Sequence, residues 1–517
     1  MQQPDPVAAN NSTDTPETDW FIFLGGSGLL LTVVATIVLA PEWSANAINT
    51  ARTFLTGEFG VWYVLGGCAV FFFLVGLAIS KHGRLVLGRE GEAPAYSKFS
   101  WVAMLFCTGI GASLIYWGAT EWVYYFEDPP FGVEPRSDEA ILWASTYGMF
   151  HWGPFAWALY CLPTVGFCIS YHVKNKPVLR LSAACEGVLG AQAEKWPGRV
   201  IDLLFIVGLL GTASTGLAFG VELVTSALTR AWGIPDSRLT QFAVMGVATL
   251  LIAYSVYRGL DKGIKVLSVI NATLALALIA YVTIIGPTRF ILEMGTTSVG
   301  HMLQNFMQMI TWTDPLRRST FIEDWTVFYW AWWLALGPFV GMFVAKISRG
   351  RTLRQVIFGM IGWGSLGCAL FFIALGNYAL DLELSGAYGV VEHVQQYSPS
   401  SAIAAIVELL PMGSFLLIYL AVIGIVFVAT TYDSATYTLA AGSTRYLTTS
   451  QHPARPMRVY WAFTLGLLPS SLLFLGGLGP LQTASIVASL PLLVIYGMLL
   501  VSIVRMLDDL PETATRN

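Results

Sequence analysis

Two clusters of aromatic residues inside apolar segments are the clearest candidates for chemistry. Trp157 and Tyr160 are helix neighbours three residues apart, and the Gly-Pro pair after Trp152 can bend the chain so that the three rings converge. Indole faces attract a cation that cannot lose its charge, with about 0.5–2 kcal/mol per ring when water is excluded. The pattern therefore indicates a quaternary ammonium ligand. The second cluster comprises Trp325, Tyr329, Trp330, Trp332 and Trp333.

The same tryptophans have a structural alternative, which is the belt of indole rings at the level of the lipid headgroups. For Trp325 and Trp330, expected near an external helix end, the belt and a binding role are equally supported. For Trp152, Trp157 and Trp333, which lie deeper or beside helix breaks, we favour a binding site. Periodicity alone does not decide between the two interpretations.

Composition places these clusters in a membrane protein. Of 517 residues, 55% are hydrophobic and only 12% are charged, too few charges to cover several water-facing domains. The net charge of -4 offers no basic excess for a nucleic acid partner. The six Cys and six His are scattered, which predicts no zinc or haem site. A polytopic membrane enzyme is a remote alternative, because no catalytic set is assigned and only dispersed candidates exist: Glu121, His151, Glu222 and Asp433.

Twelve apolar runs of about 20 residues, the length that about 30 Å of hydrocarbon requires, predict an all-α polytopic membrane protein. The first run lacks a basic flank and is interpreted as a retained span, not a signal peptide. An even number puts both termini on one side, and most Lys and Arg fall in the connections of that side, which predicts cytoplasmic termini. The runs are 20–40, 61–80, 101–119, 141–171, 201–229, 239–257, 264–287, 327–347, 356–377, 414–444, 458–476 and 482–506.

Two of these runs contain helix-weakening residues at membrane depth. The third holds the sequence from Gly109 to Ser113, and the eighth holds Gly337, Pro338 and Gly341. Two interrupted helices five spans apart indicate an internal repeat of five plus five helices. Close helix packing explains one such cluster more simply, but two clusters in corresponding positions favour a binding site.

The stretch from Glu323 to Trp333, continued through Gly337 to Thr352, resembles the signature of the betaine/choline/carnitine transporter family. The segments Tyr116–Glu121 and Phe150–Pro154 match in order and spacing, and the similarity covers about residues 20–506. The resemblance implies a LeuT-like fold of 12 transmembrane helices with a 5+5 inverted repeat, helices 3–7 and 8–12, after two additional N-terminal helices. It further implies a homotrimer in the bacterial inner membrane that moves a betaine, choline or carnitine-type solute and needs no cofactor.

This organisation divides the chain into a cytoplasmic N-terminal tail, two additional helices with a cytoplasmic loop, a first five-helix repeat, a periplasmic amphipathic connector, a second repeat and a short cytoplasmic tail. The boundaries are 1–19, 20–100, 101–288, 289–326, 327–506 and 507–517. By resemblance, the connector helps to form the trimer contact. Osmotically activated members of the family carry long charged C-terminal extensions, so the short tail here predicts weak or absent osmotic regulation.

By position, the resemblance places the family's central aromatic box on five residues of this chain: Trp152, Trp157, Tyr160 and Trp333, with Trp332 adjoining. Trp325 and Trp330 fall along the access route to that box, and Glu121 and Tyr124 match pocket positions of the carnitine members. Ser113 stands where betaine symporters carry glycine and choline carriers tend to carry aspartate. The choice among these substrates therefore stays open.

The resemblance also implies Na+ as the coupling ion, held by carbonyl and hydroxyl oxygens. The positions concerned are Cys107, Ile110, Thr212, Asn271, Phe427, Thr430 and Thr431. Sodium-independent exchangers of the family carry arginine at the position of Asn271 and methionine at that of Val340, and they lose one hydroxyl of the threonine pair. The residues present here favour sodium symport.

Three alternatives to this sodium site remain. A membrane threonine often bonds only its own helix, and Thr212, Ser214 and Thr215 also fit a packing seam of small residues. A proton could replace sodium at Asp433 or Glu222, because carboxylates inside spans are commonly functional. A sodium-independent substrate exchanger is the third alternative.

Overall fold

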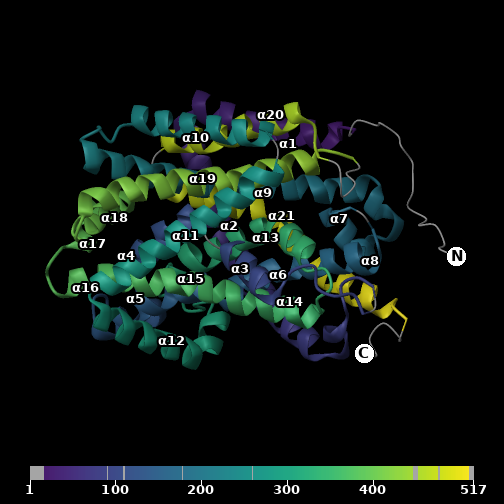
Figure 1. Cartoon of the computed structure of the whole chain (residues 1–517), viewed down its shortest axis with the longest axis horizontal. Coiled ribbons are helices and arrows are strands. Elements are labelled where there is room, and N and C mark those ends of the chain that lie inside the picture. The colour runs from purple at the N-terminus through teal and green to yellow at the C-terminus, as the bar shows by residue number, and fades with distance from the viewer. Residues whose placement is uncertain are drawn as a thin grey trace.

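The computed structural model of the chain describes residues 17–89, 91–108, 111–176, 178–258, 260–445, 452–475 and 478–511. These residues are predominantly helical and contain no β-strand, only two isolated bridges. Most of the long helices run lengthwise through one bundle (Figure 1). The architecture is all-α, as the sequence predicts.

Each predicted apolar run falls on a helix or on joined helices. By length and hydropathy, nine such stretches of the described residues can cross a membrane, or ten when the α11–α12 pair, bent by 110°, counts as one span. The count of twelve stays a prediction. The helices over the predicted runs are α1 (Trp20–Leu39), α2 (Pro41–Ile79), α3 (Lys98–Thr108), α4 (Ala112–Glu127), α5 (Asp138–His151), α6 (Pro154–Cys168), α9 (Trp196–Trp232), α10 (Arg238–Arg258), α11 (Leu260–Ile285), α13 (Val327–Ile347), α14 (Leu353–Gly359), α15 (Ser365–Phe371), α16 (Asn377–Leu384), α19 (Gly413–Gly442), α20 (Arg455–Leu475) and α21 (Leu478–Asp508).

Shorter helices fill the connections between these elements. Four of them are π-helical turns, which widen a helix locally and often occur at functional sites: η3 (Ile169–Val173), η5 (Ile322–Thr326), η6 (Met360–Gly364) and η7 (Phe372–Gly376). The remaining elements are η1 (Lys81–Arg84), η2 (Pro130–Gly132), α7 (Leu181–Ala184), α8 (Glu186–Leu189), η4 (Gly190–Glu194), α12 (Thr288–Thr311), α17 (Val390–Gln396) and α18 (Pro399–Glu408).

Two of the predicted interruptions are present. In the third run, α3 ends at Thr108 and α4 begins at Ala112, after Gly111 in extended conformation (φ -144°, ψ 173°). In the fourth run, α5 ends at His151 and α6 begins at Pro154. The helical conformation is therefore interrupted just before Ser113 and at Trp152 and Gly153.

The predicted break in the eighth run is wrong, because α13 continues through Gly337, Pro338 and Gly341. The two glycines serve helix packing instead. A Cβ on Gly337 would lie 2.0 Å from the hydroxyl of Tyr496, and one on Gly341 would lie 2.9 Å from the backbone nitrogen of Thr164. Bare glycine surfaces let neighbouring membrane helices approach closely, which is the simpler explanation that the sequence had left open.

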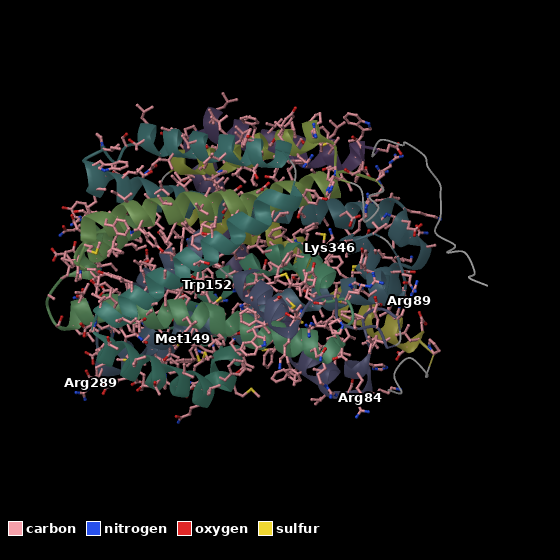
Figure 2. All side chains as sticks on the ribbon, in the orientation of Figure 1. Arg84, Arg89, Met149, Trp152, Arg289 and Lys346 are labelled. Atoms are coloured by element: carbon pink, nitrogen blue, oxygen red, sulfur yellow. The ribbon has the colours of Figure 1, made fainter. Side chains whose placement is uncertain are left out.

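The two ends of the bundle differ in their charged residues. Figure 1 shows α7 and α8 at one end and α16, α17 and α18 at the other. Arg84, Arg89 and Lys346 lie toward the first end, and Arg289, on α12, lies at the opposite end (Figure 2). Three of these four basic side chains thus lie toward one end and the fourth lies at the other. Which end faces the cytoplasm stays a prediction.

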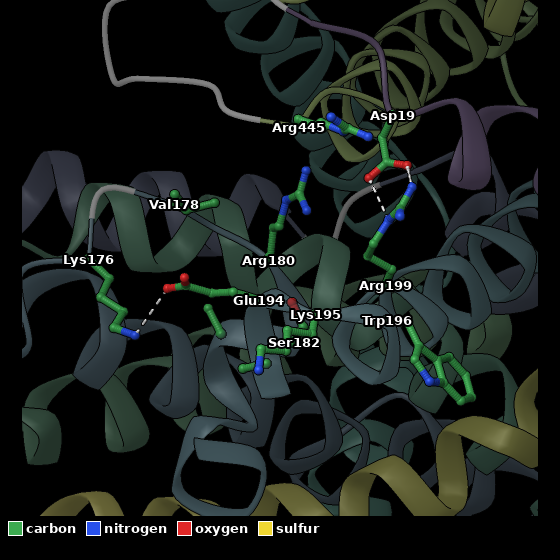
Figure 3. A pocket seen from close by; sticks show the side chains of 12 residues that line it. Asp19, Lys176, Val178, Arg180, Ser182, Glu194, Lys195, Trp196, Arg199 and Arg445 are labelled. Carbon is green, nitrogen blue, oxygen red and sulfur yellow. Dashed lines mark hydrogen bonds and ion pairs between the residues drawn. The ribbon is translucent and has the colours of Figure 1, made fainter. Parts of the chain in front are cut away.

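An ion pair and a backbone hydrogen bond hold the N-terminal segment against the end of the bundle that contains α7 and α8. The Asp19 carboxylate accepts hydrogen bonds from the Arg199 guanidinium, and the Asp19 backbone N–H donates to the carbonyl of Ser443 at 2.8 Å. Burial alone would raise the pKa of Asp19, but the bond and charge of Arg199 bring it below its ordinary value. These groups border a cavity of about 390 Å³ in which Lys176 is likewise paired, with Glu194 (Figure 3).

Candidate functional site

Five aromatic rings from two separate stretches of chain meet inside the bundle. The first stretch supplies Trp152, directly after α5, and then Trp157 and Tyr160 on α6. The second supplies Trp332 and Trp333 on α13, which packs extensively against α6. None of the five side chains is more than 7% exposed, and Trp152 lies near the middle of the molecule (Figure 2). The structure thus brings together the rings that the sequence had selected.

Trp333 is the centre of this ring cluster. Its ring centroid lies 4.8 Å from that of Trp152 at 74° and 5.5 Å from that of Tyr160 at 84°. Trp332 stacks parallel on Trp333 at 5.3 Å, and Trp157 meets the face or edge of Tyr160 at 5.6 Å and 83°. Rings at near right angles present faces as well as edges to the space between them, and the negative faces attract cations.

Local sequence explains how Trp152 and Trp333 meet. Gly153 adopts a non-helical conformation (φ -97°, ψ -141°) in which a Cβ would lie 2.2 Å from the carbonyl oxygen of Met149, so only glycine fits. Pro154 opens α6 in the first turn, where its missing N–H has no consequence. The end of α5 leaves carbonyls without helical partners, and Trp333 Nε1 donates to that of His151 at 2.9 Å.

Glu121 lies at the edge of the ring cluster and is fully buried. Its Oε2 atom accepts hydrogen bonds from Trp152 Nε1 at 3.0 Å and from the Tyr329 hydroxyl at 2.6 Å, and its Oε1 atom accepts one from the Tyr125 hydroxyl. The carboxylate therefore joins α4 to both halves of the ring cluster and fixes the Trp152 indole in one orientation.

The hydrogen bonds continue beyond Glu121. The Tyr125 hydroxyl lies 2.8 Å from His151 Nδ1, and His151 Nε2 lies 3.2 Å from the hydroxyl of Thr326 in η5. The sequence patterns assign neither Tyr125 nor Thr326 to the site, place Tyr329 only in the second aromatic cluster, and give His151 only as a dispersed candidate. One signal was available, because Tyr125 follows Glu121 by four residues and the two side chains must share a helix face.

Ser113 is close to the ring cluster. A Cβ on Gly216 of α9 would lie 3.1 Å from the Ser113 hydroxyl, 2.6 Å from that of Tyr432 and 3.9 Å from the Trp332 ring. The absent side chain of Gly216 therefore lets two hydroxyls and an indole surround one point. The role of Ser113 in choosing the substrate stays a prediction.

Tyr124 and Trp325 form a separate pair, with ring centroids 4.9 Å apart. Both line a cavity of about 360 Å³ that also contains Asp128, whose pKa is raised by burial and by the charge of Asp324. Trp330 is not part of this pair. It is fully buried and stacks on Phe155 at 4.6 Å, on another side of α13.

The residues predicted for sodium partly converge. Asn271 Nδ2 donates to the Thr430 hydroxyl at 3.1 Å, and the Asn271 Oδ1 atom is buried without a partner in the described part of the chain. Thr430 itself donates to the carbonyls of Val426 at 2.9 Å or Phe427 at 3.1 Å. A Cβ on Gly111 would lie 3.8 Å from the Thr431 hydroxyl, which brings the broken third helix to the same place.

Three other sodium candidates give less support. The Thr212 hydroxyl donates to the carbonyl of Gly208 at 2.7 Å in its own helix, as a structural threonine does. The side chain of Cys107 and all of Ile110 lie outside the described residues. Asp433 is one of the two carboxylates considered as proton carriers. It accepts a hydrogen bond from Ser255 at 2.6 Å, and its Oδ1 atom has no partner among the described residues.

The ring cluster is buried inside a bundle of long apolar helices, and comparisons with known sequences identify the kind of membrane protein. Residues 21–512 match the betaine/carnitine/choline family transporter profile. The chain is 35% identical to the carnitine transporter of Acinetobacter baumannii over 92% of this chain and 85% of that protein. It is 33% identical to the glycine betaine transporter OpuD of Bacillus subtilis, over 91% of each. A probable glycine betaine transporter of Desulfitobacterium hafniense is 32% identical, over 93% of this chain and 96% of that protein.

The chain belongs to the betaine/carnitine/choline transporter family. It is a multi-pass membrane transporter and not an enzyme.

Proposed function

We propose that this transporter imports a quaternary-ammonium solute of the betaine, choline or carnitine type and binds the ammonium group in the box of Trp152, Trp157, Tyr160, Trp332 and Trp333. The observation that carries the proposal is the buried meeting of these rings from two stretches of chain, with near-perpendicular contacts around Trp333. A trimethylammonium group cannot donate a strong hydrogen bond, so ring faces replace water around it better than polar groups do.

Transport proceeds by alternating access in a LeuT-like fold of twelve helices, with inverted repeats over 101–288 and 327–506 and two additional helices before them. Three features support this fold. The apolar runs fall on helices, the third run is interrupted near Ser113, and the π-helical turn η5 opens the corresponding helix of the second half. The continuity of α13 shows that the second repeat does not use Gly337-Pro338 for its break.

Sodium is the proposed coupling ion, with Asn271, Phe427, Thr430 and Thr431 around it and the third helix closing the site. The buried, unpartnered Oδ1 atom of Asn271 supports this assignment because a hard cation needs such an oxygen. A threonine hydroxyl that donates to its own helix still presents lone pairs to a cation.

The protein lies in the bacterial cytoplasmic membrane with both termini in the cytoplasm, and it assembles as a homotrimer through α12. The excess of Lys and Arg in the connections on the side of the two termini supports the orientation. The helix α12 sits where the amphipathic connector is expected and turns sharply from α11.

Uptake into proteoliposomes tests the proposal. Glycine betaine, choline and carnitine are offered with and without an inward sodium gradient, and with and without solute inside. We expect sodium-dependent uptake into empty vesicles, lost in Trp333→Leu. Uptake that needs internal solute and ignores sodium would instead establish an exchanger, and uptake driven by a proton gradient alone would establish proton coupling.

A further inference from the structure

The buried Glu121 carboxylate has no cationic partner among the described residues. Its three hydrogen-bond donors, Tyr125, Trp152 and Tyr329, are all uncharged, and the nearest basic group is the imidazole of His151, with Nδ1 3.8 Å from Oε1. A buried carboxylate without a counter-charge is costly unless it takes up a proton or gains a cation nearby. Glu121 has access to both, because a chain of hydrogen bonds can bring it a proton and the proposed cation site lies beside it.

The chain of hydrogen bonds can hold either of two proton contents without losing a bond. In the first, Tyr125 donates to the Glu121 carboxylate, His151 Nδ1–H donates to the Tyr125 oxygen, and Thr326 donates to His151 Nε2. With one more proton, every bond reverses. The Glu121 acid then donates to Tyr125, Tyr125 donates to His151 Nδ1, and His151 Nε2–H donates to Thr326. The net charge changes from minus one to zero.

The cation site adjoins this chain of bonds through one residue. Trp152 donates its indole N–H to Glu121 while its ring packs at 4.8 Å against Trp333 of the proposed box. An ammonium group among the rings would therefore lie close to the negative form of the Glu121 network and stabilise it, in a region from which water is excluded.

Other titratable groups lie near the network but do not supply its counter-charge. Tyr147 on α5 packs against Tyr125 at 5.8 Å, and the charge of Glu222 on α9 acts on Tyr116 and Tyr124. Neither α13 nor η7 places a Lys or Arg in an ion pair with Glu121 among the described residues. The substrate itself is the cation best placed to do so.

We propose that Glu121, Tyr125 and His151 form a proton-binding site that competes with the transported cation, so that solute binding expels one proton from the network. The inference rests on the proposed role of the aromatic box. Because the two ligands exclude each other, the apparent Kd for the solute should rise by up to tenfold for each pH unit below the midpoint of the network.

Calorimetry on the purified full-length protein tests the competition. Glycine betaine, choline and carnitine are titrated between about pH 5.5 and 8.5, a range that spans the ordinary titration of histidine. Buffers of different ionisation enthalpy give the number of protons released. We expect release of up to one proton per bound solute and weaker binding at low pH. Glu121→Gln, which keeps an acceptor for Trp152 but cannot titrate, should bind with no proton release and no pH dependence.

Two further variants separate this site from its surroundings. Glu222→Gln, the matched change in another carboxylate of the bundle, should release protons as the unchanged protein does. Tyr125→Phe cuts the link to His151 and should displace the pH midpoint of release. Binding without proton release, or release lost in Glu222→Gln and kept in Glu121→Gln, would overturn the inference. Failure of all three solutes to bind would instead overturn the proposed function.

Discussion

The same dipeptide, Gly-Pro, occurs in two membrane helices with opposite results. At Gly153-Pro154 the helix stops and restarts, whereas α13 passes through Gly337-Pro338 without interruption. The difference lies in what each glycine accommodates. Gly153 is needed by its own backbone, because a Cβ there would meet the carbonyl of Met149 at 2.2 Å. Gly337 is needed by a neighbouring helix.

The neighbouring helix is α21, whose Tyr496 side chain extends across Gly337. The sequence of α6 explains why it does so. Pro163 lies inside α6 and has no N–H, so the carbonyl of Leu159 four residues earlier lacks its helical partner. The Tyr496 hydroxyl supplies the missing donor at 3.1 Å. It reaches Leu159 across the surface of Gly337, where a Cβ would lie 2.0 Å from the hydroxyl. A Gly-Pro pair at membrane depth therefore marks either a break or a close contact, and tertiary packing decides which.

The largest effect is expected for Gly153→Ala. Its Cβ would collide with backbone, which cannot move aside without reshaping the junction of α5 and α6 that sets Trp152 against Trp333. We expect most of the protein to be lost to misfolding, and any folded remainder to bind no solute. Size-exclusion chromatography of detergent extracts and a binding assay check both points. A well-folded variant with normal affinity would show that the conformation of Gly153 is not needed to form the site.

Gly337→Ala should destabilise less, by about 1–3 kcal/mol, because the clash is with the far end of a side chain. The added methyl also displaces Tyr496 from Leu159 and leaves a buried carbonyl unpaired. In a thermal-unfolding cycle, Gly337→Ala added to Tyr496→Phe should cost little more than Tyr496→Phe alone. Pro163→Ala, which restores the helical donor for Leu159, should recover part of the Tyr496→Phe loss. Additive costs would contradict the packing explanation.

Pro338→Ala should have the smallest effect, below about 1 kcal/mol, because α13 is already helical at this position and alanine favours helix. Uptake should stay within about twofold of the unchanged protein, which corresponds to a few tenths of a kcal/mol. Loss of uptake with normal stability would mean that α13 must open at Pro338 during the cycle. The comparison between the two Gly-Pro pairs would then hold only for one conformation.

The sequence predicts the part of this fold that depends on hydrophobic length and local geometry. The apolar runs lie on helices, and the interruption after Trp152 follows from residues adjacent in the chain. The continuity of α13 through Gly337 and Pro338 could not be predicted, because it depends on Tyr496, about 160 residues away. The resemblance selected the ring cluster, but the partners of Glu121 come from α4, from the junction between α5 and α6 and from α13, and Tyr329 and Thr326 carry no local signal that would join them to it. Trp325 and Trp330 are predicted to share an access route, but they pack against different side chains, Tyr124 and Phe155, which the local sequence does not indicate.

The most direct test of the central claim is whether the rings recognise the positive charge. Glycine betaine and tert-butylacetate have the same shape, but the second has carbon in place of the quaternary nitrogen. Ligand-dependent tryptophan fluorescence should show saturable binding of glycine betaine in the presence of sodium and at least tenfold weaker binding of the carbon analogue. Trp333→Leu should weaken glycine betaine by about 10- to 30-fold, the contribution of one desolvated ring. Equal affinity for the two ligands, or unchanged affinity in Trp333→Leu, would contradict the account.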